Sequence, residues 1–155
     1  MSDDPSPGGH TTPSSPAVLV SDRYGGPVTV DVADLVALAQ RTLAGEGLAE
    51  VEVSLSFVEE AEIEDLHVRY LHEPGSTDVL SFPLDGEDER GVRVLGDVVV
   101  APAVAARNNP RDPTAELRLL VVHGVLHLLG FDHEEEAEKA EMWSRQTTYS
   151  GVAAP

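Results

Sequence analysis

The sequence of 155 residues contains no cysteine. Disulfide bonds and thiolate zinc sites are therefore excluded, and any transition metal must be held by His, Asp or Glu side chains. No apolar run approaches the roughly 18 to 20 residues that span a bilayer, so we expect no membrane partner. The first 16 residues are acidic and lack the apolar core of a secretory signal, which favours a cytoplasmic protein.

Basic side chains are also scarce. The chain has 10 Lys and Arg against 28 Asp and Glu, which gives a formal net charge of −18. A chain this acidic is repelled as a whole by a polyanion, and proteins that bind nucleic acids usually present a basic face. Much of the acid lies in the first residues, in the loop 85–89 and in the run 134–136. If RNA binds, we therefore expect a neutral or positive potential at the binding cleft itself.

The hydrophobic pattern predicts a single α+β domain over residues 17–150, preceded by a disordered tail rich in Ser, Pro and Gly over residues 1–16. Strands are predicted at residues 17–20, 51–57, 79–84 and 94–100, the last two as a hairpin. Helices are predicted after Asp31, over residues 63–70, from Asp112 to Leu129, and from Asp132 through Trp143. Asp132 is expected to be the N-cap of the last helix, with Glu135 completing a capping box.

Three of the six histidines lie within the short segment 123–133, on a helix whose residues 117–129 include one charged side chain and are expected to be buried. His123 and His127 are four residues apart, an offset of about 40° and one turn, so both imidazoles can face one ion. Gly130 can adopt the left-handed conformation that ends a helix, after which the chain can bring His133 to the same point. Three imidazoles with one open position are the ligand set of a catalytic zinc ion. We therefore predict one Zn²⁺ ion held by His123, His127 and His133.

The alternative is that His123 and His127 are hydrogen-bonded core residues and that His133 is a solvated turn residue. Burying two imidazoles among leucines is costly unless their nitrogens are satisfied, and a metal ion satisfies them. The ligand set does not fix the metal, because copper, iron and nickel also accept imidazole.

The spacing of the histidines also matches the metzincin protease pattern H-E-x-x-H-x-x-G-x-x-H in all but one respect. Gly124 stands where those proteases have the glutamate that acts as general base. The metal site therefore remains in the sequence, but the usual route to peptide hydrolysis is missing.

The segment 123–133, HGVLHLLGFDH, resembles the signature H-G-x-L-H-L-x-G-[FY]-D-H of the YbeY family of bacterial endoribonucleases and rRNA maturation factors. Two more family segments occur in the same order, TDVLSFP at residues 77–83 and LGD at residues 95–97, so that the resemblance covers roughly residues 17–148. It implies a small mixed β-sheet flanked by helices and a zinc-dependent endoribonuclease that acts on single-stranded RNA. It also implies 3′-end maturation of small-subunit (16S) ribosomal RNA and ribosome quality control, with ribosomal proteins or assembly factors as further partners.

The chain departs from the family at one position. Many members carry an arginine, thought to face the substrate, six residues before the threonine of TDVLSFP, and Leu71 stands there in this chain. Arg69 is a candidate replacement, but on a helix it points about 200° away from residue 71. A solvated surface charge is an equally good interpretation of Arg69.

The remaining candidates each have a functional and a structural interpretation. Asp132 could orient a ligand histidine, could serve as an N-cap, or could do both. Through the family resemblance, Ser81 and Asp78 could line the metal cleft, although Asp78 could also only fix the turn before its strand. The same two interpretations apply to Asp97.

For several other arginine and histidine residues we predict no catalytic or binding role. Arg107, Arg111 and Arg118 surround the start of the helix that carries the histidines, and we favour the interpretation that they offset local acidic charge over phosphate contact. His67 and His72 are predicted to be surface residues.

Two other functions remain open from the sequence. One is a metzincin-like metallohydrolase or protease, which would cleave a casein-type substrate and leave RNA intact. The other is a non-catalytic ribosome-assembly factor in which zinc is structural. A His127→Ala variant that loses its fold with its metal would favour the assembly factor, whereas a folded variant that no longer cleaves RNA would favour the enzyme.

Overall fold

The structure is a computed structural model that describes residues 15–72, 75, 77–131 and 135–152. Within them the chain forms β1 (Ala17–Asp22), α1 (Val32–Gly45), β2 (Val51–Phe57), α2 (Glu60–Leu71), β3 (Val79–Glu87), β4 (Arg93–Val100), α3 (Pro102–Asn108), α4 (Pro113–Leu128) and α5 (Glu136–Ser150). None of the helices in this described part combines the length and the apolar composition needed to cross a membrane.

The strands of the described chain form one mixed sheet in the order β1-β2-β4-β3. β2 pairs in parallel with both β1 and β4, and β3 pairs with β4 as the predicted antiparallel hairpin. The alternating apolar residues of β2, Val51, Val53, Leu55 and Phe57, are all buried in the larger hydrophobic core. The mixed sheet and its flanking helices confirm the predicted α+β fold class.

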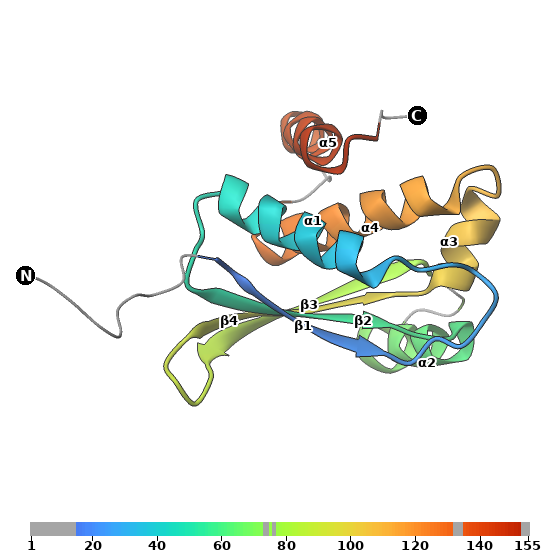
Figure 1. Cartoon of the computed structure of the whole chain (residues 1–155), viewed down its shortest axis with the longest axis horizontal. Helices are drawn as coiled ribbons and strands as arrows, with labels where there is room; N and C mark the ends of the chain where they lie inside the picture. Colours follow the sequence, from blue (N-terminus) through green and yellow to red (C-terminus); the bar gives the residue numbers. More distant parts are fainter. Residues whose placement is uncertain (1–14, 73–74, 76, 132–134, 153–155) are drawn as a thin grey trace, which may run out of the picture.

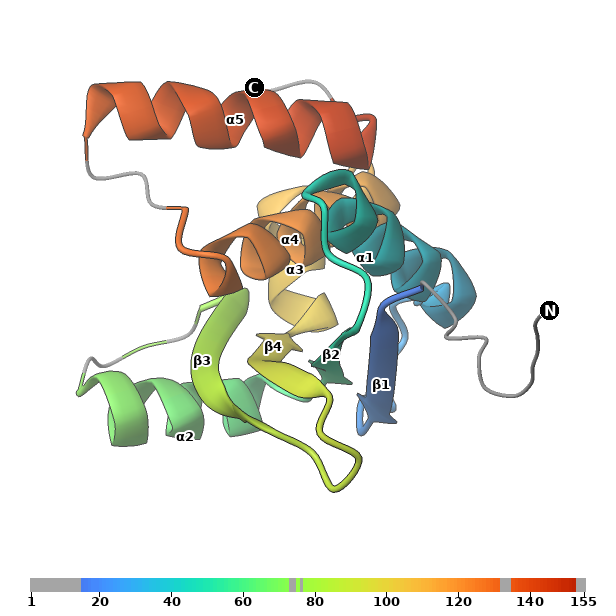
Figure 2. The ribbon, with the colours of Figure 1, turned by 90° about the vertical axis from the view of Figure 1, so that its left-hand side faces the viewer.

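Helices cover both faces of the sheet. α1 and α4 pack together across one face, α5 lies over them as an outer layer, and α2 lies on the other face (Figure 1; Figure 2). The larger core includes Leu38 of α1 and Leu126 of α4, whereas a smaller core around Ile63 and Val99 lies on the α2 side. α4 is therefore enclosed by neighbours, which explains why a helix with so few polar side chains is stable in this position.

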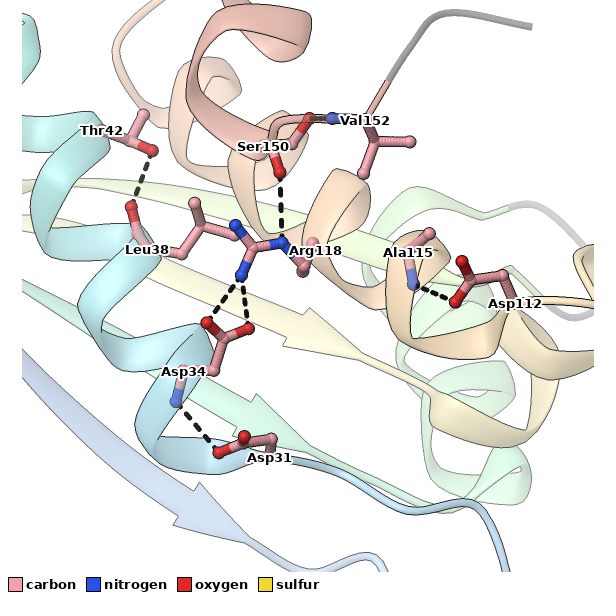
Figure 3. A network of polar contacts seen from close by, with 9 residues as sticks. All are labelled: Asp31, Asp34, Leu38, Thr42, Asp112, Ala115, Arg118, Ser150 and Val152. Atoms are coloured by element: carbon pink, nitrogen blue, oxygen red, sulfur yellow. Dashed lines mark hydrogen bonds and ion pairs between the residues drawn. The ribbon is translucent and has the colours of Figure 1, made fainter.

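α4 is fixed to its neighbours by polar contacts near its start. The Asp112 side chain caps the helix by accepting a 3.0 Å hydrogen bond from the backbone N–H of Ala115 (Figure 3). One Nη atom of Arg118 donates to both carboxylate oxygens of Asp34 on α1, at 2.6 and 2.5 Å. Nε of Arg118 donates to the carbonyl oxygen of Ser150, the last residue of α5, at 3.1 Å. A single side chain thus joins α1, α4 and α5.

The start of the last helix differs from the prediction. α5 begins at Glu136, and Glu135 is its N-cap, with extended backbone angles of φ −104° and ψ 150° and no side-chain cap hydrogen bond. The predicted capping box is therefore wrong, because it places Glu135 inside the helix; Asp132 itself lies outside the described residues. Glu136 and Glu138 in the first turn stabilise the N-terminus through the helix dipole instead.

Three further boundaries also differ. α3 is absent from the prediction, because a helix of seven residues is too short to show a clear apolar period. α5 continues beyond Trp143 to Ser150. Pro16, assigned to the tail, is buried, and its carbonyl oxygen accepts a 3.2 Å hydrogen bond from Nε2 of Gln40. Residues 1–14 of the predicted tail lie outside the described residues.

Candidate metal centre

α4 brings two of the predicted ligands together. The rings of His123 and His127 have centroids 4.6 Å apart and planes at 70° to each other. Just beyond them Gly130 has a positive φ of 97°, its N–H donates to the carbonyl of His127, and the N–H of Phe131 donates to that of Leu126. These two bonds form the Schellman pattern that ends a helix. The helix therefore ends at Leu128, one residue after His127, and Gly130 has the left-handed conformation that the sequence predicts.

His123 is oriented by a buried residue of α5. Nδ1 of His123 lies 2.5 Å from Oε1 of Gln146, whose relative exposure is 2%. A carbonyl oxygen can only accept a hydrogen bond, so Nδ1 carries the proton and the lone pair of the ring lies on Nε2. A neutral imidazole nitrogen with a lone pair is the atom that binds a metal ion. The contact with Gln146 therefore fits His123 as a metal ligand.

Gly124, which follows His123, brings α4 close to the sheet. A Cβ atom at this position would lie 2.5 Å from Cγ1 of Val98 and 3.3 Å from Oγ of Ser81. The Ser81 hydroxyl also donates a 3.0 Å hydrogen bond to the carbonyl oxygen of Gly124. Any side chain at this position would require Val98 to shift, so the close approach of α4 to the sheet depends on glycine here.

The two histidines line a cavity of about 400 Å³. Its other walls come from β3, from the turn before β3 and from α2. The described residues that line it are His67, Leu71, Thr77, Asp78, Val79, Leu80, Ser81, Pro83, His123 and His127. Among them the one carboxylate is that of Asp78, which accepts a 2.9 Å hydrogen bond from Nδ2 of Asn108. The strong acidity of the whole chain is therefore not repeated in the described lining of this cavity.

α2 reaches the cavity through His67 and Leu71, four residues apart on one helical face. His67 is partly buried, and its Nδ1 donates a 3.0 Å hydrogen bond to the carbonyl oxygen of Gly75. His67 is thus a partly exposed residue, as predicted, but it lies at the cavity, which the sequence did not indicate. The Arg69 side chain is instead 63% exposed, pairs with Asp65 at 2.8 Å and does not line the cavity. Arg69 therefore does not replace the family arginine, in agreement with its helical offset from residue 71.

Two of the three predicted zinc ligands, His123 and His127, lie within the described residues. Within residues 15–72, 75, 77–131 and 135–152, no group of three His, Cys, Asp or Glu side chains is arranged to hold a metal ion. His133 and Asp132 lie outside these residues, so their roles as third ligand and as orienting residue stay predictions. The neighbouring imidazoles and the tautomer of His123 nevertheless fit two positions of such a site.

Other candidate residues have structural partners or lie elsewhere. Asp97 lines a different cavity, of about 540 Å³, together with residues of β1, β2 and α2. Arg107 forms two 2.7 Å hydrogen bonds with the carboxylate of Glu60, and Arg118 pairs with Asp34 as described above. These two arginines therefore offset local acidic charge, which is the interpretation that the sequence favoured.

Glu116 adds to the electrostatics of α4. Burial first, and then the negative charge of Asp78, raises the pKa of the Glu116 carboxyl above its usual range. Glu116 is seven residues before His123 and so lies on the same face of the helix. Glu116 is not among the residues that line the cavity, and its raised pKa reflects first its own burial.

The sequence matches the family model described as Endoribonuclease YbeY over residues 27–151. The chain belongs to this family. A protein named Endoribonuclease YbeY from Beutenbergia cavernae is 48% identical over 130 residues, which cover 77% of this chain and 87% of that protein. The protein of the same name from Streptomyces coelicolor is 47% identical over 107 residues, which cover 61% of this chain and 65% of that protein. The solution structure of TM1509 from Thermotoga maritima is similar with a TM-score of 0.56 and 29% identity, over 86% of each chain.

Two residues of this YbeY-family site were missed by the sequence analysis. His67 carries a usable signal, because it lies one helical turn before Leu71, the position at which the family arginine is expected. Gln146 carries no such signal, because a lone glutamine on an amphipathic helix does not indicate which residue of another helix it will contact. Packing of α5 over α4 creates that contact.

Proposed function

We propose that this chain is a zinc-dependent endoribonuclease that matures the 3′ end of small-subunit ribosomal RNA in the cytoplasm and takes part in ribosome quality control. Membership of the YbeY endoribonuclease family supports the RNA substrate and the hydrolytic reaction. The observation that carries the zinc assignment is the pair of imidazoles, His123 and His127, whose rings lie 4.6 Å apart at one cavity.

His123, His127 and His133 would hold the ion. When bound, a zinc ion in a three-histidine site lowers the pKa of bound water and offsets negative charge on phosphoryl oxygens. The buried Gln146 keeps the lone pair of His123 on Nε2, and α4 ends at Leu128, one residue after His127. An ion site that opens on a cavity of about 400 Å³ is typical of a catalytic zinc, because structural zinc sites are closed by four protein ligands.

The residues that line the cavity offer both polar and apolar contacts to RNA. We assign to His67, as the doubly protonated imidazolium, a hydrogen bond from Nε2–H to a phosphodiester oxygen. His67 lines the same cavity as the two predicted ligands, and its Nδ1–H is donated to the Gly75 carbonyl. Leu71, Val79 and Pro83 provide apolar surface that can pack against a ribose or base. Arg107 and Arg118 are bound to carboxylates and do not serve as phosphate clamps.

The proposal is tested with the purified chain and three substrates. These are an RNA that spans the 3′ end of precursor 16S rRNA, an unrelated single-stranded RNA of the same length, and casein. We expect cleavage of RNA, greatest at the precursor 3′ end, and intact casein. Cleaved casein with intact RNA would favour a metallopeptidase, and no cleavage of any substrate by zinc-loaded protein would favour a non-catalytic assembly factor.

A further inference from the structure

We propose that Gln146 is a positioning residue for the metal centre. Through Gln146, helix α5 holds the His123 imidazole in the tautomer and orientation that can bind a metal ion. The inference rests on the proposed zinc site and adds to it a residue outside the histidine motif. Gln146 does not contact the metal position or the substrate; it acts through the imidazole of His123.

The geometry of the contact defines this role. Oε1 of Gln146 lies 2.5 Å from Nδ1 of His123, and the glutamine is buried. A carbonyl acceptor at Nδ1 selects one tautomer, fixes the rotation of the ring and increases the basicity of the opposite nitrogen. Solvent cannot replace this acceptor, because only 2% of Gln146 is exposed.

Gln146 can perform this task because α5 is firmly anchored on both sides of it. Arg145 pairs with Glu46 at 3.1 Å, and the Tyr149 hydroxyl donates a 2.5 Å hydrogen bond to the same carboxylate. Arg118 binds the carbonyl of Ser150 at the end of the helix. The position of the glutamine is therefore determined by contacts that do not involve His123.

α5 also contacts the segment that leads toward the third predicted ligand. The guanidinium of Arg145 lies over the ring of Phe131, 4.7 Å from its centroid. Phe131 follows the glycine that ends α4, two residues before His133 in the sequence. Two adjacent residues of α5 thus contact α4 and the segment that follows it: Gln146 contacts His123, and Arg145 contacts Phe131. This placement is expected of a helix that supports a metal site.

The test compares three variants by their affinity for Zn²⁺, measured by competition with a chromophoric chelator. Gln146→Leu removes the acceptor and keeps a side chain of similar size, and Gln146→Glu keeps an acceptor. Tyr149→Phe is the comparison variant for a general loosening of α5, since it removes one anchor of the helix and keeps the contact between Gln146 and His123. We expect Gln146→Leu to weaken zinc binding by about 10- to 100-fold, the usual effect of losing a residue that orients a ligand. Gln146→Glu should retain the wild-type affinity. Tyr149→Phe should weaken zinc binding less than Gln146→Leu, because Arg145 and Arg118 still anchor α5.

A second measurement needs no metal and no variant. The ¹⁵N shifts of the His123 imidazole in the metal-free wild-type protein should report a proton on Nδ1. A proton on Nε2, an unchanged affinity in Gln146→Leu, or an equal loss in Gln146→Leu and Tyr149→Phe would each overturn the inference. A wild-type protein that binds no zinc would overturn the proposed function, and the tautomer distinguishes that failure from a wrong assignment of Gln146.

Discussion

The hydroxyl of Ser81 on β3 donates a 3.0 Å hydrogen bond to the carbonyl oxygen of Gly124, the residue that follows His123 on α4. This bond joins the strand that lines the cavity to the helix that carries the ligands. It requires a close approach, and a Cβ atom at Gly124 would lie only 2.5 Å from Cγ1 of Val98. The distance of the histidines from β3 is thus set by the absence of a side chain at position 124.

Gly124→Ala should destabilise the fold. Overpacking of a tight core costs about 1–3 kcal/mol, whereas the better helix propensity of alanine returns only about 1 kcal/mol. We expect a net loss of about 1 kcal/mol in the free energy of unfolding, measured by urea denaturation. Val98→Ala in the same chain should relieve the clash, so that the double variant loses less than the sum of the two single variants. Additive losses would show that Val98 does not limit the approach of α4.

Ser81→Ala should lower the free energy of unfolding by about 1 kcal/mol, because it removes one intramolecular hydrogen bond. The variant should still cleave RNA and bind zinc as tightly as the wild type, since the hydroxyl hydrogen is engaged by the Gly124 carbonyl. Urea denaturation and a cleavage assay check the two statements. A variant of normal stability that cannot cleave RNA would instead identify the Ser81 hydroxyl as a group that acts on the substrate.

His67→Ala should lower kcat/KM for RNA cleavage by roughly 10- to 100-fold, since a hydrogen bond to a charged group contributes about 1.5–3 kcal/mol. Its zinc affinity should not change, because His67 is assigned to substrate. Arg69→Ala, on the same helix, is the control and should cleave RNA normally, because Arg69 pairs with Asp65 away from the cavity. A larger loss in Arg69→Ala than in His67→Ala would reverse the two assignments.

The packing of α5 should be sensitive to alkaline pH. Burial, and next the hydrogen bond to Glu46, raises the pKa of Tyr149 from 10 to about 12. The folded state thus holds this proton more tightly than the unfolded state, so the stabilisation is complete below pH 10 and is lost as pH rises toward 12. Over this interval the unfolding free energy of the wild type should fall more steeply with pH than that of Tyr149→Phe. Equal slopes for the two proteins would contradict the raised pKa.

The sequence predicts the elements that carry strong local signals. Asp112 and Gly130 mark the two ends of the segment that becomes α4, and both have the expected capping and left-handed geometry. The alternating residues of β2 also predict its buried face. The start of α5 is predicted wrongly, because Asp132 and Glu135 fit a capping box while the helix begins at Glu136. A capping motif shows only that a helix can begin at a given residue. The packing of α5 on α1 and α4 determines where this helix lies.

The residues of the candidate site also fall into those that the sequence predicts and those that it does not. His123 and His127 are predictable because four residues on one helix fix their relative position before any tertiary contact forms. His67 and Gln146 are not, because they reach the site only when α2 and α5 pack against the rest of the fold. The roles of His133 and Asp132 rest on the sequence, because both residues lie outside the described part of the structure.

The proposed chemistry is tested most directly by an RNA cleavage assay on protein whose metal content has been measured. The assay compares the wild type, the wild type treated with a chelator, and His127→Ala, whose fold is checked by circular dichroism. We expect one zinc ion per wild-type chain, loss of cleavage on chelation, its recovery when Zn²⁺ is returned, and no cleavage by a folded His127→Ala variant. Cleavage that survives both the chelator and the substitution would contradict a zinc-dependent nuclease at these histidines.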